Sequence, residues 1–134
     1  MGKVIKFQSK SKQDSSNITD KSINNTNVKQ FGLSDFEMSL RKALEDYILS
    51  TFAVKNILGM DIVFKEHKSN IGILGVVAYE HKRKAGTYVA NFISEAVNEK
   101  GNVRVIEVAF EAGEPDLYRS IYNTLKAKKI LPEF

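Results

Sequence analysis

The chain of 134 residues contains no cysteine and only two histidines. Without cysteine there can be no disulfide bond, no thiolate zinc site and no cysteine nucleophile. His67 and His81 have no partner at metal-ligand spacing. Because histidines in polar turns are usually solvated, we expect no metal site.

Long apolar runs are missing as well. No segment approaches the roughly 20 apolar residues that span a bilayer, and the first residues lack the apolar core of a signal peptide. We therefore predict a cytoplasmic protein that makes no membrane contact.

The chain also lacks the motifs of common enzyme classes. It contains no glycine-rich phosphate loop of the Walker type, no nucleophile elbow and no zincin motif. Carboxylates cluster towards the C-terminal end, at Glu107, Glu111, Glu114 and Asp116. Acid–base catalysis needs a pair of carboxyl groups in different environments, whereas carboxylates in a loop are usually hydrated. The residues thus favour a protein that is not an enzyme and binds no cofactor.

Lysine and uncharged polar residues are abundant near the N-terminus. Residues 1–33 carry six lysines and two aspartates, while residues 34–134 carry fourteen basic and fourteen acidic side chains, so the first segment accounts for the net charge of +4. Residues 8–30 cannot bury enough apolar surface to offset the entropy of ordering them. We predict a disordered basic tail over residues 1–32 and a single domain over residues 33–134.

Two helices are predicted near the ends of this domain. Ser34 and Glu37 form a capping box. An apolar stripe at helical spacing follows, at Phe36, Leu40, Leu44, Ile48 and Phe52. Pro115 stands at a favoured first-turn position before a second helix. The apolar stripe of that helix consists of Leu117, Tyr118, Ile121, Tyr122 and Leu125.

The residues between these helices predict strands and one further helix. Residues 61–66 and 71–79 should form a hairpin, because turn residues join them. Residues 88–97 place apolar side chains at helical spacing, and Gly101 suits the end of a helix. Residues 103–110 alternate as a strand does. A strand, a helix and a strand in this order predict two parallel strands with a right-handed crossover.

The predicted fold class is α/β, with elements in the order α-β-β-α-β-α and helices that cover a small mixed sheet. Such a sheet leaves at least one edge unpaired, and natural proteins protect sheet edges. The apolar residues of segment 4–7 could cover one edge as an added strand. We expect a second copy of the chain to cover the other, which makes a homodimer.

A basic loop follows the strand over residues 71–79. It contains Lys82, Arg83, Lys84, Gly86 and Thr87. Where a strand leads into a helix, free N–H groups and the helix dipole favour an anion. The alternative is a solvated turn beside Glu80. We expect a non-catalytic intracellular binding module that contacts an acidic partner, nucleic acid or protein. Its contacts would be this loop and the tail lysines, Lys3, Lys6, Lys10 and Lys12.

At this loop the chain resembles the acyl-CoA N-acyltransferase superfamily over roughly residues 71–125. That family follows a central strand with Arg or Gln, two residues, Gly, one residue, and Gly or Ala. Arg83 and Gly86 match this pattern, and Tyr88 departs from it. The resemblance implies a divergent acyltransferase as the alternative function. Its residues 83–88 would hold the pyrophosphate of acyl-CoA, and Tyr118 or Tyr122 would resemble the family's general acid.

Overall fold

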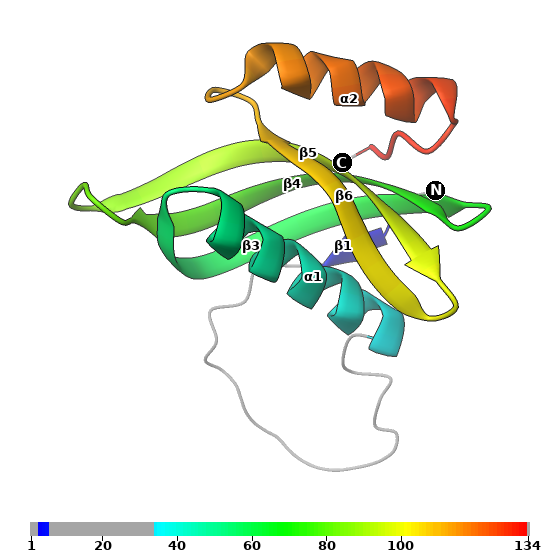
Figure 1. The fold of residues 1–134 in the computed structure, drawn as a ribbon, viewed down its shortest axis with the longest axis horizontal. Coiled ribbons are helices and arrows are strands. Elements are labelled where there is room, and N and C mark those ends of the chain that lie inside the picture. Colours follow the sequence, from blue (N-terminus) through cyan, green and yellow to red (C-terminus); the bar gives the residue numbers. More distant parts are fainter. Residues whose placement is uncertain (1–2, 6–33, 134) are drawn as a thin grey trace.

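A computed structural model describes residues 3–5 and 34–133 of the chain. The described residues form an α/β fold with an antiparallel sheet and two helices (Figure 1). The elements are β1 (Lys3–Ile5), α1 (Asp35–Thr51), β3 (Val54–His67), β4 (Asn70–His81), β5 (Thr87–Glu99), β6 (Asn102–Phe110) and α2 (Pro115–Ala127). No described helix is both long and apolar enough to cross a membrane.

The sheet has five strands in the order β1-β3-β4-β5-β6, and every neighbouring pair is antiparallel. Residues 68–69 and 100–101 form turns in which both residues have positive φ, as in the type I′ turns that suit the twist of a hairpin. β1 pairs with β3 over three positions, from Lys3 opposite Phe64 to Ile5 opposite Ile62. Residues 4 and 5 of the segment 4–7 that was expected to cover an edge thus lie in an edge strand, and residues 6 and 7 lie outside the described residues.

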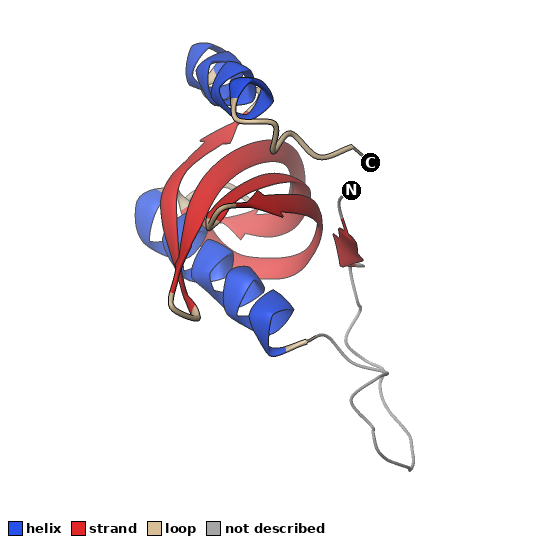
Figure 2. Ribbon diagram, turned by 90° about the vertical axis from the view of Figure 1, so that its right-hand side faces the viewer, coloured by secondary structure: helices blue, strands red, loops and turns tan. Residues whose placement is uncertain are grey.

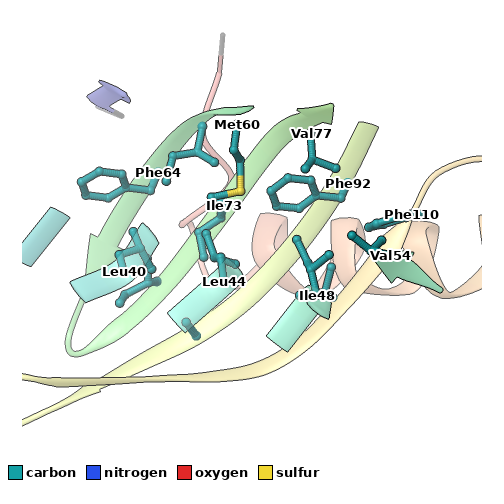
Figure 3. Packing of buried hydrophobic residues seen from close by; sticks show 14 residues of the cluster. Leu40, Leu44, Ile48, Val54, Met60, Phe64, Ile73, Val77, Phe92 and Phe110 are labelled. Carbon is teal, nitrogen blue, oxygen red and sulfur yellow. The ribbon is translucent and has the colours of Figure 1, made fainter. Parts of the chain in front are cut away.

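The helix α1 covers one face of the sheet, which we call the α1 face. Ser34 Oγ accepts a hydrogen bond from the Glu37 N–H, and a Glu37 carboxylate oxygen accepts one from the Ser34 N–H, so the predicted capping box is present. Figure 3 shows the buried stripe of α1 packed against strand residues. The stripe consists of Leu40, Leu44 and Ile48, and its partners include Met60, Ile73, Val77, Phe92 and Phe110.

The helix α2 covers the opposite face, which we call the α2 face (Figure 2). Ile121 and Leu125 of α2 are buried with Ile130, which follows the helix, against Ile93 of β5. Phe92 belongs to the core under α1 and Ile93 to the core under α2. Successive residues of β5 therefore point to opposite faces and are buried on both.

The prediction of a helix over residues 88–97 is wrong. These residues lie in β5, which pairs with β4 on one side and β6 on the other. The predicted parallel pair, the crossover, the mixed sheet and the α-β-β-α-β-α order are therefore wrong as well. Because both faces of β5 are covered, its apolar residues show no simple alternation, and β-branched and aromatic residues favour the strand. The predicted disordered tail lies outside the described residues except for β1.

Candidate functional site

The predicted site residues of the folded domain lie together at one end of the sheet. Residues 82–86 connect β4 to β5, and Lys82, Arg83, Lys84, Gly86 and Thr87 are all exposed. We call residues 81–88 the hairpin tip. Figure 1 shows that the hairpin tip projects beyond the ends of both helices. It is therefore accessible from several sides.

The prediction that this loop leads into the N-terminus of a helix is wrong, because β5 follows the loop. The hairpin tip has no helix dipole and no set of free first-turn N–H groups. The helix that the resemblance to acyltransferases implies after the strand and loop is also missing here, since β5 follows the loop. Any attraction for anions at the hairpin tip must come from its side chains.

The backbone of the hairpin tip is held by several hydrogen bonds. The Tyr88 hydroxyl donates to the Ala85 carbonyl at 3.0 Å, and the Arg83 N–H donates to His81 Nδ1 at 3.0 Å. The Lys82 N–H donates to the Ala53 carbonyl at 3.1 Å. Gly86 has φ 96°, a conformation that glycine adopts at little cost. These bonds fix the loop and orient the rings of His81 and Tyr88.

The hairpin tip carries three exposed cations. Among the described residues, Lys82, Arg83 and Lys84 take part in no ion pair. The segment 81–88 contains no carboxylate. The nearest in sequence, Glu80, accepts a hydrogen bond at 2.7 Å from the side-chain amide of Asn56 on β3. No described residue neutralises these three charges, which can therefore meet a negatively charged partner.

A row of aromatic rings lies beside these cations on the α1 face. Tyr79 and Tyr88 stand directly opposite each other on β4 and β5, and their stacked ring centroids are 5.8 Å apart. His81 contacts the Tyr88 ring edge-on at 6.0 Å. All three side chains are half-buried. We call Tyr79, Tyr88 and His81 the aromatic row.

The aromatic row is anchored in the hydrophobic core. The centroid of the Tyr79 ring is 6.0 Å from that of Phe110, and Phe110 stacks on Phe52 at 4.4 Å. Phe52 caps the C-terminal end of α1. The rings at the hairpin tip are thus supported by a packed end of the domain rather than by a free loop.

The aromatic row was missed by sequence reasoning. Tyr88 was expected on a helix and His81 in a solvated turn. The signal was present in the spacing, because Tyr79 and Tyr88 flank the basic residues and become neighbours once residues 79–88 are recognised as a hairpin.

The edge of β5 is open next to the hairpin tip. β6 ends at Phe110, opposite Phe92, so the part of β5 from Thr87 to Ala90 has no strand on that side among the described residues. The Glu111 N–H donates to the Asn91 carbonyl at 2.9 Å, which closes the ladder there. Val89, on the open stretch, is 70% exposed. A partner could therefore lie along the α1 face or this edge without displacing a strand.

The tail lysines are not placed with the hairpin tip. Lys3 lies in β1 opposite Phe64, whereas His81 pairs with Val54 at the other end of β3. Ten residues of strand correspond to roughly 30 Å. Lys6, Lys10 and Lys12 lie outside the described residues.

Two hollows adjoin α2 and share Tyr118. One of about 410 Å³ is lined by residues that include Leu74, Val76 and Asn91. The other, of about 380 Å³, is lined by residues that include Glu111 and Arg119. Burial raises the pKa of Tyr118, and Glu111 and Tyr122 raise it further, so this hydroxyl stays protonated at neutral pH. In this form it can donate a hydrogen bond to a group in either hollow.

No group of three or more His, Asp or Glu residues in the described part of the chain could hold a metal ion. Comparisons of the chain with protein-family models, with curated proteins and with solved structures find no match. The function must therefore be inferred from the geometry described above.

Proposed function

We propose that this protein is a small non-catalytic binding module and that its hairpin tip contacts an acidic partner. The observation that carries the proposal is the set of three exposed cations, Lys82, Arg83 and Lys84, none of which forms an ion pair with another described residue. Lys42 and Arg104 are also exposed, but each faces a carboxylate. Other exposed lysines with no ion pair to a described residue, such as Lys68 and Lys100, are single residues in separate turns, whereas the hairpin tip carries three consecutive cations.

The lysines of the N-terminal segment add a second source of attraction. Lys6, Lys10 and Lys12 lie in a segment with four more positive than negative charges, counted over residues 1–33. Such charges attract polyanions over about one Debye length, roughly 8 Å at physiological salt. This attraction is weak and independent of sequence, and it falls as salt rises. In this proposal the segment raises the rate of encounter, and the hairpin tip makes the lasting contact.

Binding assays with charge-removing variants test this proposal. Fluorescence anisotropy of the full chain would be measured with labelled DNA, RNA and polyglutamate at low and moderate salt. The triple variant Lys82→Gln, Arg83→Gln, Lys84→Gln should weaken binding. A matched variant that removes the same charge elsewhere, Lys68→Gln, Lys100→Gln, Lys126→Gln, should weaken it far less, because these lysines are exposed but lie away from the hairpin tip.

Equal weakening by the two triple variants would mean that net charge alone attracts the probes, and it would overturn the hairpin tip as the contact. A third variant, with Lys3, Lys6, Lys10 and Lys12 changed to Gln, separates the two parts of the proposal. It should lower the association rate more than it raises the dissociation rate. A cytoplasmic location stays a prediction, which cell fractionation would test.

A further inference from the structure

We propose that the acidic partner of the hairpin tip is a single-stranded nucleic acid. Its bases would stack on the rings of the aromatic row while its phosphates contact Lys82, Arg83 and Lys84. This inference rests on the proposed function and adds the class of partner. It is carried by the position of two kinds of side chain, cations and aromatic rings, on the same projecting hairpin.

The rings are held ready for stacking. The Tyr88 ring is fixed by its hydrogen bond to the Ala85 carbonyl and by stacking on Tyr79. The His81 ring is fixed by the N–H of Arg83 and by the edge of Tyr88. Because these side chains are already ordered, a base that stacks on them loses little of its binding energy to ordering the protein. Proteins that bind single strands use such stacking surfaces beside a positively charged track.

The order of side chains along the hairpin suits a strand of nucleic acid. Tyr79, His81 and Tyr88 lie on the α1 face, and the basic loop follows directly beyond them. The phosphates of a strand whose bases lie on the rings can reach the cations of the loop. The open edge of β5 from Thr87 to Ala90 leaves room for the strand to pass.

Other acidic partners would use only part of this surface. In a duplex the bases are already stacked on each other and their faces are closed, so a duplex can meet the cations but not the rings. A carboxylate of an acidic protein likewise meets the cations and leaves the rings without a matching group. The aromatic row therefore favours a partner with free π faces, and each stacked base is expected to raise the affinity about tenfold.

The test measures binding of the full-length protein to a single strand, to an abasic strand of equal charge and to a duplex. The probes are a labelled single strand of about 12 nucleotides, an abasic phosphodiester strand of the same length, and a duplex. We expect the single strand to bind about tenfold more tightly than the abasic strand and the duplex. Equal affinity for the single strand and the abasic strand would overturn the inference.

Two variants of Tyr88 distinguish the loss of the aromatic ring from a general disturbance of the fold. Tyr88→Leu removes the ring and should lower single-strand affinity about tenfold towards that of the abasic strand. Tyr88→Phe keeps the ring and loses the hydroxyl, and it should keep most of the affinity. Tyr122→Leu removes an exposed tyrosine of α2 and should leave binding unchanged. An equal loss in Tyr88→Leu and Tyr122→Leu would also count against stacking at the hairpin tip.

A measurement on the unaltered protein covers the case in which Tyr88→Leu does not fold. The chain has five tyrosines and no tryptophan, so tyrosine emission can be observed directly. Stacked bases should quench this emission, and the abasic strand should not. One outcome is that the triple charge variant loses binding, while the unaltered protein binds the single strand and the abasic strand equally and both have the same effect on tyrosine emission. The inference then fails while the proposed function stands. If the triple charge variant binds as the unaltered protein does, both fail.

Discussion

Gly72 of β4 lies directly against the backbone of Ile130, so closely that a Cβ atom at Gly72 would stand 2.0 Å from the Ile130 carbonyl oxygen. Ile130 follows α2 and is fully buried with Leu125 and Ile93. The chain after α2 can thus lie on the sheet because β4 has no side chain at this point. The contact closes the core of the α2 face.

The first prediction concerns this contact. Gly72→Ala should lower the free energy of unfolding by at least about 2 kcal/mol, because the Ile130 backbone must move and the core beneath it must repack. The matched control is Gly113→Ala, where the nearest atom to the added Cβ is 3.8 Å away. The free energy of unfolding of that variant should lie within about 0.5 kcal/mol of that of the unaltered protein. Urea denaturation of both variants checks the difference, and equal stability would contradict the contact.

The second prediction concerns the ion pair between Glu95 and Lys128. Lys128 Nζ lies 2.5 Å from a Glu95 carboxylate oxygen, and the Glu95 side chain is only 11% exposed. Lys128→Met should lower the free energy of unfolding by about 1–2 kcal/mol, because it leaves a nearly buried carboxylate without its cation. The effect is not larger because the Lys128 side chain is 44% exposed and solvent screens the pair. Adding Glu95→Gln to Lys128→Met should recover part of the loss.

Lys42 provides the matched control for this ion pair. Its partner is Asp46, and their side chains are 76% and 62% exposed. Lys42→Met should change the free energy of unfolding by no more than about 0.5 kcal/mol. A loss as large as that of Lys128→Met would show that burial of the carboxylate is not the cause.

The third prediction concerns alkaline pH. Burial, with Glu111 and Tyr122, raises the pKa of Tyr118 in the folded protein above its unfolded value. The resulting stabilisation is complete below the unfolded pKa, which is about 10, and it is lost as pH rises through the folded pKa. Melting temperatures measured from neutral to strongly alkaline pH should fall less steeply in Tyr118→Phe than in the unaltered protein. Tyr47→Phe, on α1 at the opposite face of the sheet, is the control, and equal slopes in all three proteins would refute the prediction.

The two helices could be predicted from the sequence because each has one buried face and one exposed face. For α1, the capping box at Ser34 and the stripe through Ile48 locate the start and the inner face. For α2, Pro115 and the stripe through Leu125 do the same. The first helix ends at Thr51, one residue before the end of the predicted stripe, since Phe52 is already extended and leads into β3.

The strand β5 could not be predicted by periodicity. Phe92 and Ala96 are buried under α1, while Ile93 is buried under α2. Adjacent apolar residues repeated every four positions match a helix as well as a strand with two covered faces. What selects the strand is the long pairing with β4, from Asn70 opposite Val97 to Glu80 opposite Thr87, which involves residues distant in the chain.

The candidate site was predictable only in its charges. Lys82, Arg83 and Lys84 stand together in the sequence, and their exposure follows from their position in a turn. Tyr79 and Tyr88 approach each other because of the register of the hairpin. The predicted helix over residues 88–97 leaves no hairpin at this place. The wrong secondary structure for one segment thus concealed the aromatic half of the site.

The last prediction concerns the outer edge of the sheet. β6 has β5 as its one neighbour among the described strands, so the backbone groups on its other side are available for pairing. Ile106 is 43% exposed on this edge. Because natural proteins rarely leave such an edge open, we expect a second copy of the chain to pair along β6 and form a homodimer.

Light scattering across micromolar concentrations checks this prediction. The unaltered protein should show the mass of two chains. Ile106→Lys should shift the mass towards one chain, because a charge on the paired edge must be desolvated in the dimer. Met38→Lys, at an apolar residue of α1 that is 57% exposed, adds the same charge away from the edge and should leave the dimer intact. A mass of one chain that persists as the unaltered protein is concentrated would refute the dimer, and dissociation by both variants would place its interface elsewhere.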